Sequence, residues 1–171
     1  MSDSGGGKGV NVDVNFKDVW SAVHDVGDWY SSEATFNLVN NAFVIPKGVT
    51  SPNELEGWIG EPHVITESDG WSGKLSDTDV RFGVVWYYGG QYNGQGRYIG
   101  NADVFFVIDE IGSFEKFRVD AAFDNPIPIG GGVAQLSGEL TYSYYEWGSL
   151  SASARYQWFI RGDGAGKIWA V

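Results

Sequence analysis

The sequence predicts a mainly β protein, an antiparallel β-sandwich or a closed barrel of about eight to ten strands with one early amphipathic helix. The apolar residues are of the kinds that favour strands: the chain has 18 valines and 10 isoleucines but only 6 leucines, and 16% of it is aromatic. Such side chains fit a pleated, half-buried surface, whereas leucine is the better helix former. Apolar and polar residues also alternate over several segments, between frequent glycines.

Length and charge restrict the function. The 171 residues suit one domain, which we place at residues 10–171 after a flexible leader over residues 1–9. A net charge of −11 repels phosphate backbones, so we expect no nucleic-acid partner. The absence of cysteine excludes disulfides, thiol nucleophiles and cysteine-based metal sites. No apolar run reaches the ~18 residues of a membrane span, and the leader lacks the apolar core of a signal peptide. We therefore expect a soluble protein, whose compartment the sequence leaves open.

The domain begins with a strand and a helix. Strict alternation from Val10 to Phe16 predicts a strand with one solvated face. Val19, Val23 and Val26 are then spaced four and three residues apart, which places them on one face of a helix over about 17–29.

The middle of the chain predicts short strands between turns. Asp69-Gly70 has the composition of a hairpin turn. The expected strands are Glu33–Val39, Ala42–Ile45, Gly57–Ile59, His63–Glu67 and Trp71–Leu75, with a turn at 40–41 and a loop at 46–56.

The second half carries the clearest alternation. Val80, Phe82 and Val84 share one face with Trp86 and Tyr88. The expected strands are Asp79–Tyr88, Arg97–Asp109, Glu115–Phe123, a long hairpin from Val133 to Ile160 that turns at Trp147-Gly148, and Lys167–Val171.

The sequence assigns no catalytic residue, cofactor or metal ligand. His24 and His63 are predicted to be ordinary polar surface residues, and no serine lies in a Gly-x-Ser-x-Gly turn. The adjacent acids Asp109 and Glu110 would point to opposite faces of a strand, so they do not form a catalytic pair. The acids around Asp69 lack the spacing of a calcium loop. These observations favour a protein that is not an enzyme.

Aromatic and amide side chains gather at two expected turns, one after Tyr88 and one at Trp147-Gly148. Such rings combine apolar area with hydrogen-bonding groups, which suits sugar faces and lipid headgroups. The predicted ligand-binding residues are Tyr87, Gln91, Tyr92, Asn93, Arg97, Tyr98, Tyr145 and Trp147.

Two segments carry a resemblance to a known superfamily. They are Val10–Trp20, which reads VNVDVNFKDVW, and Trp71–Tyr88, which reads WSGKLSDTDVRFGVVWYY. With the early helix and the absence of cysteine, they resemble the actinoporin-like superfamily, which includes pore-forming cytolysins and fungal fruit-body lectins. The resemblance implies a β-sandwich and a lectin-like or cytolysin-like activity. Ile129–Gly138 also resembles a glycine-rich strand entry of small β-barrel cyclases and dirigent-like barrels.

Three hypotheses follow. The first is a non-enzymatic module that binds glycans or lipid headgroups through aromatic residues at loop tips. The second is a small barrel enzyme of the cyclase or isomerase type, which would enclose an apolar molecule in a cavity lined by Trp86, Tyr142 and Trp158. The third is a structural or assembly protein, and homo-oligomers are compatible with all three.

Overall fold

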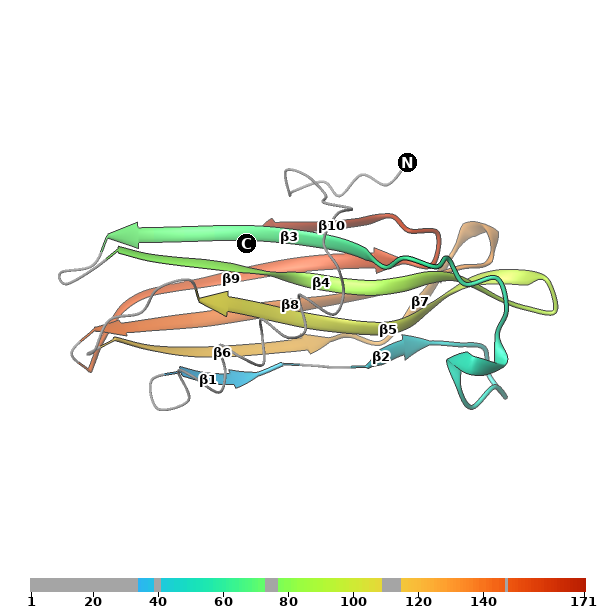
Figure 1. Cartoon of the computed structure of the whole chain (residues 1–171), viewed down its shortest axis with the longest axis horizontal. Coiled ribbons are helices and arrows are strands. Elements are labelled where there is room, and N and C mark those ends of the chain that lie inside the picture. Colours follow the sequence, from blue (N-terminus) through green and yellow to red (C-terminus); the bar gives the residue numbers. More distant parts are fainter. Residues whose placement is uncertain (1–33, 39–40, 73–76, 109–114, 147) are drawn as a thin grey trace.

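The computed structural model describes residues 34–38, 41–72, 77–108, 115–146 and 148–171, and these residues are mainly β-strand (Figure 1). The strands are β1 (Ala34–Asn37), β2 (Ala42–Val44), β3 (His63–Ser72), β4 (Asp77–Tyr92), β5 (Gln95–Ile108), β6 (Glu115–Phe123), β7 (Ile127–Ile129), β8 (Val133–Glu146), β9 (Ser149–Arg161) and β10 (Gly166–Ala170). Two short 3-10 turns are η1 (Pro52–Glu54) and η2 (Gly130–Gly132). The predicted mainly β class is confirmed. The expected leader at 1–9, strand at 10–16 and helix at 17–29 lie outside the described residues.

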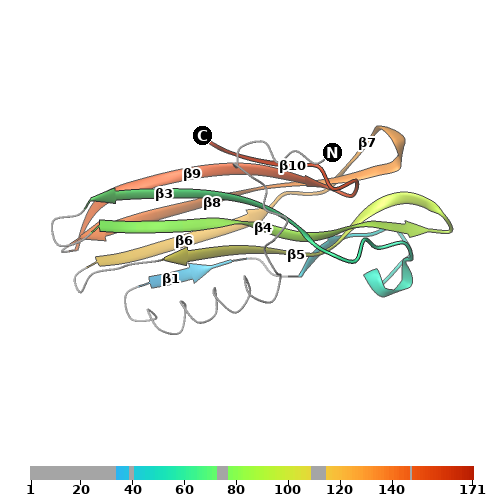
Figure 2. The same ribbon diagram turned by 45° about the horizontal axis from the view of Figure 1, so that its top comes forward.

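The strands form a nearly closed, barrel-like sheet (Figure 2). The main order of the sheet is β1-β6-β8-β5-β4-β3. β9 pairs with the other edge of β8, and β10 pairs with β9. In addition, β2 pairs with β5 and β7 pairs with β8. β5 joins β8 at one parallel pair, Arg97 and Val133. On the opposite side β3 and β10 touch near Ile65 and Gly166, with no ladder between them in the part of the chain described. We call this line of contact the β3–β10 seam.

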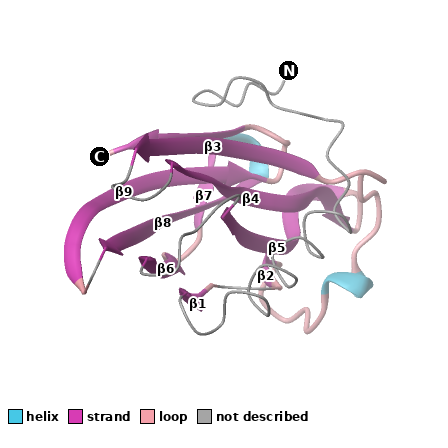
Figure 3. Ribbon diagram, turned by 60° about the vertical axis from the view of Figure 1, so that its left-hand side comes forward, coloured by secondary structure: helices cyan, strands magenta, loops and turns pink. Residues whose placement is uncertain are grey.

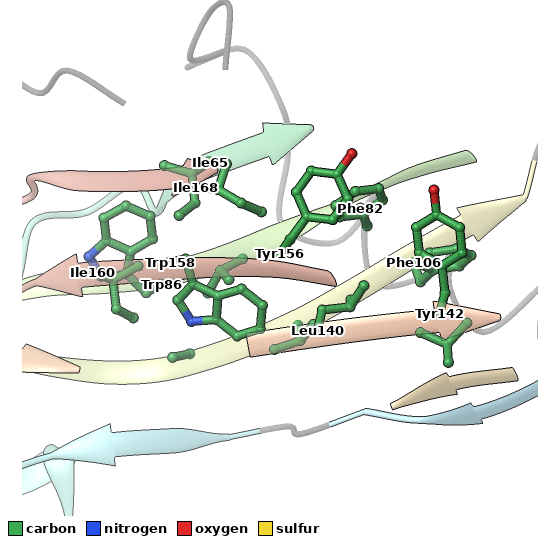
Figure 4. Packing of buried hydrophobic residues seen from close by; sticks show 14 of the residues in the cluster. Ile65, Phe82, Trp86, Phe106, Leu140, Tyr142, Tyr156, Trp158, Ile160 and Ile168 are labelled. Carbon is green, nitrogen blue, oxygen red and sulfur yellow. The ribbon is translucent and has the colours of Figure 1, made fainter. Parts of the chain in front are cut away.

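The interior is packed with aromatic and aliphatic side chains. Seen from the end where β8 meets β9, the strands curve around one interior (Figure 3). The expected alternation in β4 is confirmed, because Val80, Phe82, Val84 and Trp86 are all buried. Their partners in the core come from β3, β5, β8, β9 and β10, as the labelled residues of Figure 4 show.

One predicted turn is wrong. Asp69-Gly70 lies inside β3, which continues to Ser72 and pairs with β4 along its whole length. The Asp69 carboxylate is occupied on both oxygens: Oδ1 accepts the Gly70 N–H at 2.9 Å, and Oδ2 accepts the Tyr142 hydroxyl. Because the Asp69 side chain is bonded to β8 on the other side of the barrel, a continuous strand is favoured over a turn at this point.

Two short segments also differ from expectation. Residues 57–59 form no strand; a single bridge joins Glu56 to Gln91, and Ile59 N donates to Tyr88 O at 3.0 Å. β7 was not expected, because its central residue is a proline, which has no N–H for a ladder. The expected strand at 71–75 is not a separate strand: Trp71 and Ser72 end β3, and residues 73–75 lie outside the described residues. The other expected strands within the described residues are present with ends shifted by a few residues, and β4 extends four residues further, to Tyr92.

Candidate functional site

The predicted ligand-binding residues fall at opposite ends of the barrel. Gln91, Tyr92, Asn93, Arg97 and Tyr98 lie at the tip of the β4–β5 hairpin, which projects at the right of Figure 1. Tyr145 lies near the end of β8, at the opposite end of the molecule. Trp147 lies outside the described residues. The structure therefore brings together five of the predicted residues and separates Tyr145 from them.

Three irregular positions shape the hairpin. The β4–β5 register shifts between Val85 and Tyr87, between Tyr88 and Gly90, and between Gly90 and Tyr92. Each shift coincides with a residue of positive φ: Asn101 (47°), Gly89 (90°) and Gly96 (78°). An inserted residue exchanges the two faces of the strand beyond it.

These bulges place Gln91 and Arg97 on one side. If side chains alternated regularly along β4 from Tyr88, Gly90 and Tyr92 would lie on the same face as Tyr88. If they alternated regularly back along β5 from Ala102, Tyr98 would lie on that face too. The bulges at Gly89 and Asn101 instead bring Gln91 and Arg97 into line with Tyr88 and the buried Ile99.

Gln91 and Arg97 line a small pocket of about 210 Å³. The other residues that line it are Gly57, Ile59, Tyr88, Gly89 and Gly162. Three of the seven lining residues of this pocket are glycines, and Gln91 and Arg97 are the lining residues with long polar side chains. We call this the hairpin pocket.

The main chain around the hairpin pocket is fixed by direct contacts. Glu56 and Gln91 exchange backbone hydrogen bonds of 2.9 and 2.6 Å, and Gly89 N donates to Gly162 O at 2.9 Å. Gly162 lies so close to β5 that a Cβ there would be 2.0 Å from Arg97 O. The backbone positions of both polar residues are therefore set by their neighbours.

Trp58 holds the 52–59 segment on the hairpin. Its indole N–H donates to Pro52 O at 3.0 Å. Its ring lies over two glycines, because a Cβ at Gly90 or Gly100 would come within 2.5 or 3.0 Å of it. This segment supplies Gly57 and Ile59 to the pocket. Neither residue is among the ligand-binding residues predicted from the sequence.

His63 is not the simple surface residue that the sequence predicts. Its half-buried ring bonds to Gly164 O through Nδ1 at 2.7 Å and to the Tyr88 hydroxyl through Nε2 at 3.0 Å. A carbonyl only accepts, so Nδ1 carries the proton and Tyr88 donates to Nε2. Burial raises the pKa of Tyr88, which keeps this donor protonated. The pair anchors Tyr88 behind the hairpin pocket.

The remaining tip residues have different surroundings. Asn93 (φ 53°) and Gly94 (φ 72°) form a two-residue turn in which both residues are left-handed, the conformation in which Asn-Gly is preferred. The geometry of the turn is therefore sufficient to explain Asn93. Tyr87 is half-buried on the face of β4 opposite Trp86 and Tyr88.

A second hollow of about 260 Å³ adjoins the same end and is mainly apolar. It is lined by Val44, Tyr98, Pro126, Ile127, Pro128, Gly132, Val133 and Ala134. Tyr98 follows Arg97 directly in β5, so two neighbouring residues of one strand line different hollows: Arg97 lines the hairpin pocket and Tyr98 lines the apolar hollow.

The three residues proposed to line an internal cavity are packed in the core. Trp86, Tyr142 and Trp158 are each at most 2% exposed, and neither hollow is lined by them. Tyr142 contacts the rings of Phe82, Phe106 and Phe117 at centroid distances of 5.6 to 6.2 Å.

No group of three or more histidine, aspartate or glutamate side chains in the described part of the chain is arranged to hold a metal ion. No helix among the described residues has the length and apolarity needed to cross a membrane.

The hairpin pocket is thus a hollow whose lining combines glycines with the polar residues Gln91 and Arg97. No family model, curated protein or solved structure matches this chain. A function for this chain is therefore inferred from the chemistry of its own residues.

Proposed function

We propose that this protein is a non-enzymatic binding module that holds a glycan or a lipid headgroup in the hairpin pocket. The observation that carries the proposal is that Gln91 and Arg97 both line a glycine-rich hollow near the tip of the β4–β5 hairpin. An amide both donates and accepts, and a guanidinium donates from five N–H groups, so together they suit a ligand rich in oxygen.

Apolar side chains beside the pocket support the same function. Ile59 on the pocket wall is 45% exposed, and Tyr92, at the hairpin tip on the face away from Gln91, is 44% exposed. Sugar rings and headgroups present apolar faces between their hydroxyl groups, and an exposed tyrosine offers both apolar area and a hydroxyl.

The packed interior disfavours the barrel-enzyme hypothesis. An enzyme that encloses an apolar substrate needs an empty cavity, typically of ~300–1,000 Å³. In the interior the ring of Phe82 instead contacts the rings of both Tyr142 and Tyr156 (Figure 4).

A glycan array and a pull-down with phosphatidylcholine vesicles test the function on the full chain. We expect a hit in at least one, with Gln91→Ala and Arg97→Ala each weakening the interaction about tenfold or more, as loss of a charge-assisted or amide hydrogen bond implies. Gln157→Ala and Arg81→Gln are matched controls: Gln157 lies on β9, and Arg81 is exposed on β4 away from the pocket.

The controls should bind like the unmodified protein, and melting curves should show that every variant is folded. Blank results from both the array and the vesicles at micromolar protein would contradict the proposal. Stable homo-oligomers in light scattering together with those blanks would favour the structural hypothesis instead.

A further inference from the structure

Arg97, one of the residues that line the hairpin pocket, has no protein partner for its charge in the described residues. Arg118 pairs with Asp120 at 3.2 Å, Arg155 pairs with Glu139 at 2.7 Å, and the guanidinium of Arg161 donates to Gln135. Within the described ranges Arg97 has neither an ion pair nor a side-chain hydrogen bond. Arg81 on β4 also has no ion pair within these ranges, so what distinguishes Arg97 is its place at the pocket.

Arg97 is held in place for a ligand. Its carbonyl lies against Gly162, and its strand is joined to β8 at Val133. A guanidinium on a fixed backbone loses less freedom on binding than one on a mobile loop, and its planar fork matches a carboxylate with two parallel hydrogen bonds.

Gln91 supplies the second part of the recognition. Its side-chain oxygen lies beside Gly57, where a Cβ would come within 3.1 Å, so the missing side chain at Gly57 makes room for the amide. The amide can donate to one ring oxygen and accept from a neighbouring hydroxyl. Arg97 and Gln91 together therefore match a hydroxylated ring that carries an acidic group.

Charge and size restrict the ligand further. The net charge of −11 repels an extended polyanion, so one acidic group is favoured over a chain of them. The pocket volume of about 210 Å³ is below the range of pockets for drug-sized ligands, which suits a single sugar unit.

We propose that the hairpin pocket selects a saccharide that ends in a sugar bearing one carboxylate, with Arg97 binding the carboxylate and Gln91 an adjacent hydroxyl. This inference rests on the proposed function and narrows it to one class of ligand.

Two acidic saccharides and their neutral parents test it by calorimetric titration: sialyllactose against lactose, and cellobiouronic acid against cellobiose. At least one acid should bind about tenfold or more tightly than its parent, as expected for a charge-assisted bidentate pair. The methyl ester of that acid, which keeps the shape but removes the charge, should bind like the neutral parent.

The decisive measurement is the ratio of acid affinity to parent affinity in two variants that lose the same charge. Arg97→Gln should bring the ratio to about one, whereas Arg81→Gln should leave it unchanged. A ratio that survives in Arg97→Gln overturns the assignment.

Failure of the inference is distinguishable from failure of the function. If neither acid binds more tightly than its parent while a neutral glycan or phosphatidylcholine vesicles bind, the acid preference is wrong and the binding function stands. If no glycan and no vesicle binds, both are wrong.

Discussion

At the residue scale, two buried tryptophans differ in the partner of the indole N–H. Trp86 Nε1 donates to Arg161 O at 3.0 Å. Trp158 Nε1 is buried without a hydrogen-bond partner among the described residues. A buried donor left unpaired costs about 1–3 kcal/mol, so Trp158 is held in place by its packing alone. Its ring lies over Gly138, where a Cβ would come within 2.8 Å, and meets Phe123 edge-on at 5.7 Å.

This difference predicts unequal effects of the same substitution. Trp86→Phe and Trp158→Phe remove the same ring volume, but only Trp86→Phe breaks a hydrogen bond. We expect the Trp86 variant to lose roughly 1–3 kcal/mol more of the free energy of unfolding. Urea unfolding with m-values compared between variants measures the difference. Equal losses, or a larger loss for Trp158→Phe, would show that packing outweighs the hydrogen bond.

At the element scale, Asp69 ties β3 to the opposite side of the barrel. Its Oδ2 accepts the hydroxyl of Tyr142 on β8 and, at 3.5 Å, that of Tyr156 on β9. In the described residues β3 has no ladder with β8, β9 or β10. The Asp69 side-chain bonds therefore connect β3 to strands with which its backbone does not pair.

Removal of this tie should weaken the fold more than an ordinary strand substitution. Asp69→Ala takes the acceptor from two hydroxyls on nearly buried tyrosines, and we expect a loss of roughly 2–4 kcal/mol in unfolding free energy. Ser68→Ala, an exposed position next to it on β3, is the control and should cost under about 0.5 kcal/mol. Hydrogen exchange should also speed up along β3. A cost for Asp69→Ala no greater than the control's would contradict the tie.

The sequence predicted the strands better than it predicted the turns between them. Alternation located β4, β5, β6, β8 and β9, because each buries one face along most of its length. Asp69-Gly70 misled the prediction, since its composition is that of a turn and its partner, Tyr142, is far away in the sequence.

The candidate site was predicted only in part, for a similar reason. Gln91 and Arg97 were identified by their neighbourhood of rings and glycines, but the pocket depends on bulges and on Gly57, Ile59 and Gly162 from distant segments. Local composition does not encode those contacts. Tyr145 was grouped with the tip because both lie near turns, and the fold separates them.

At the scale of the whole molecule, folding buries tyrosine hydroxyls beside carboxylates. Burial, with a smaller contribution from Asp69, raises the pKa of Tyr156 to about 12 and that of Tyr142 well above the normal range. The folded state therefore holds these protons more tightly than the unfolded chain, in which tyrosine ionises near pH 10.

The sign of the pH dependence follows from that difference. Below pH 10 both tyrosines are protonated in both states, so their contribution to stability is complete. As the pH rises above 10 the unfolded state loses protons first, and stability falls by up to about 1.4 kcal/mol per pH unit for each group. Urea unfolding between pH 8 and pH 11.5 should show this decline. Tyr156→Phe should reduce its slope above pH 10 while the two proteins stay parallel below pH 9, and an unchanged slope would refute the assignment.

The bulged hairpin also predicts a feature that relatives of this protein should share. Gln91 and Arg97 reach the pocket because Gly89 and Asn101 each shift the strand by one residue. Deletion of Gly89 would turn Gln91 to the opposite face without changing either of the side chains proposed to bind the ligand. A relative with the same ligand should therefore keep the spacing from Trp86 to Gln91 and from Arg97 to Ala102, even where the residues between them have diverged. We therefore expect the length of this hairpin to vary less among relatives than its composition.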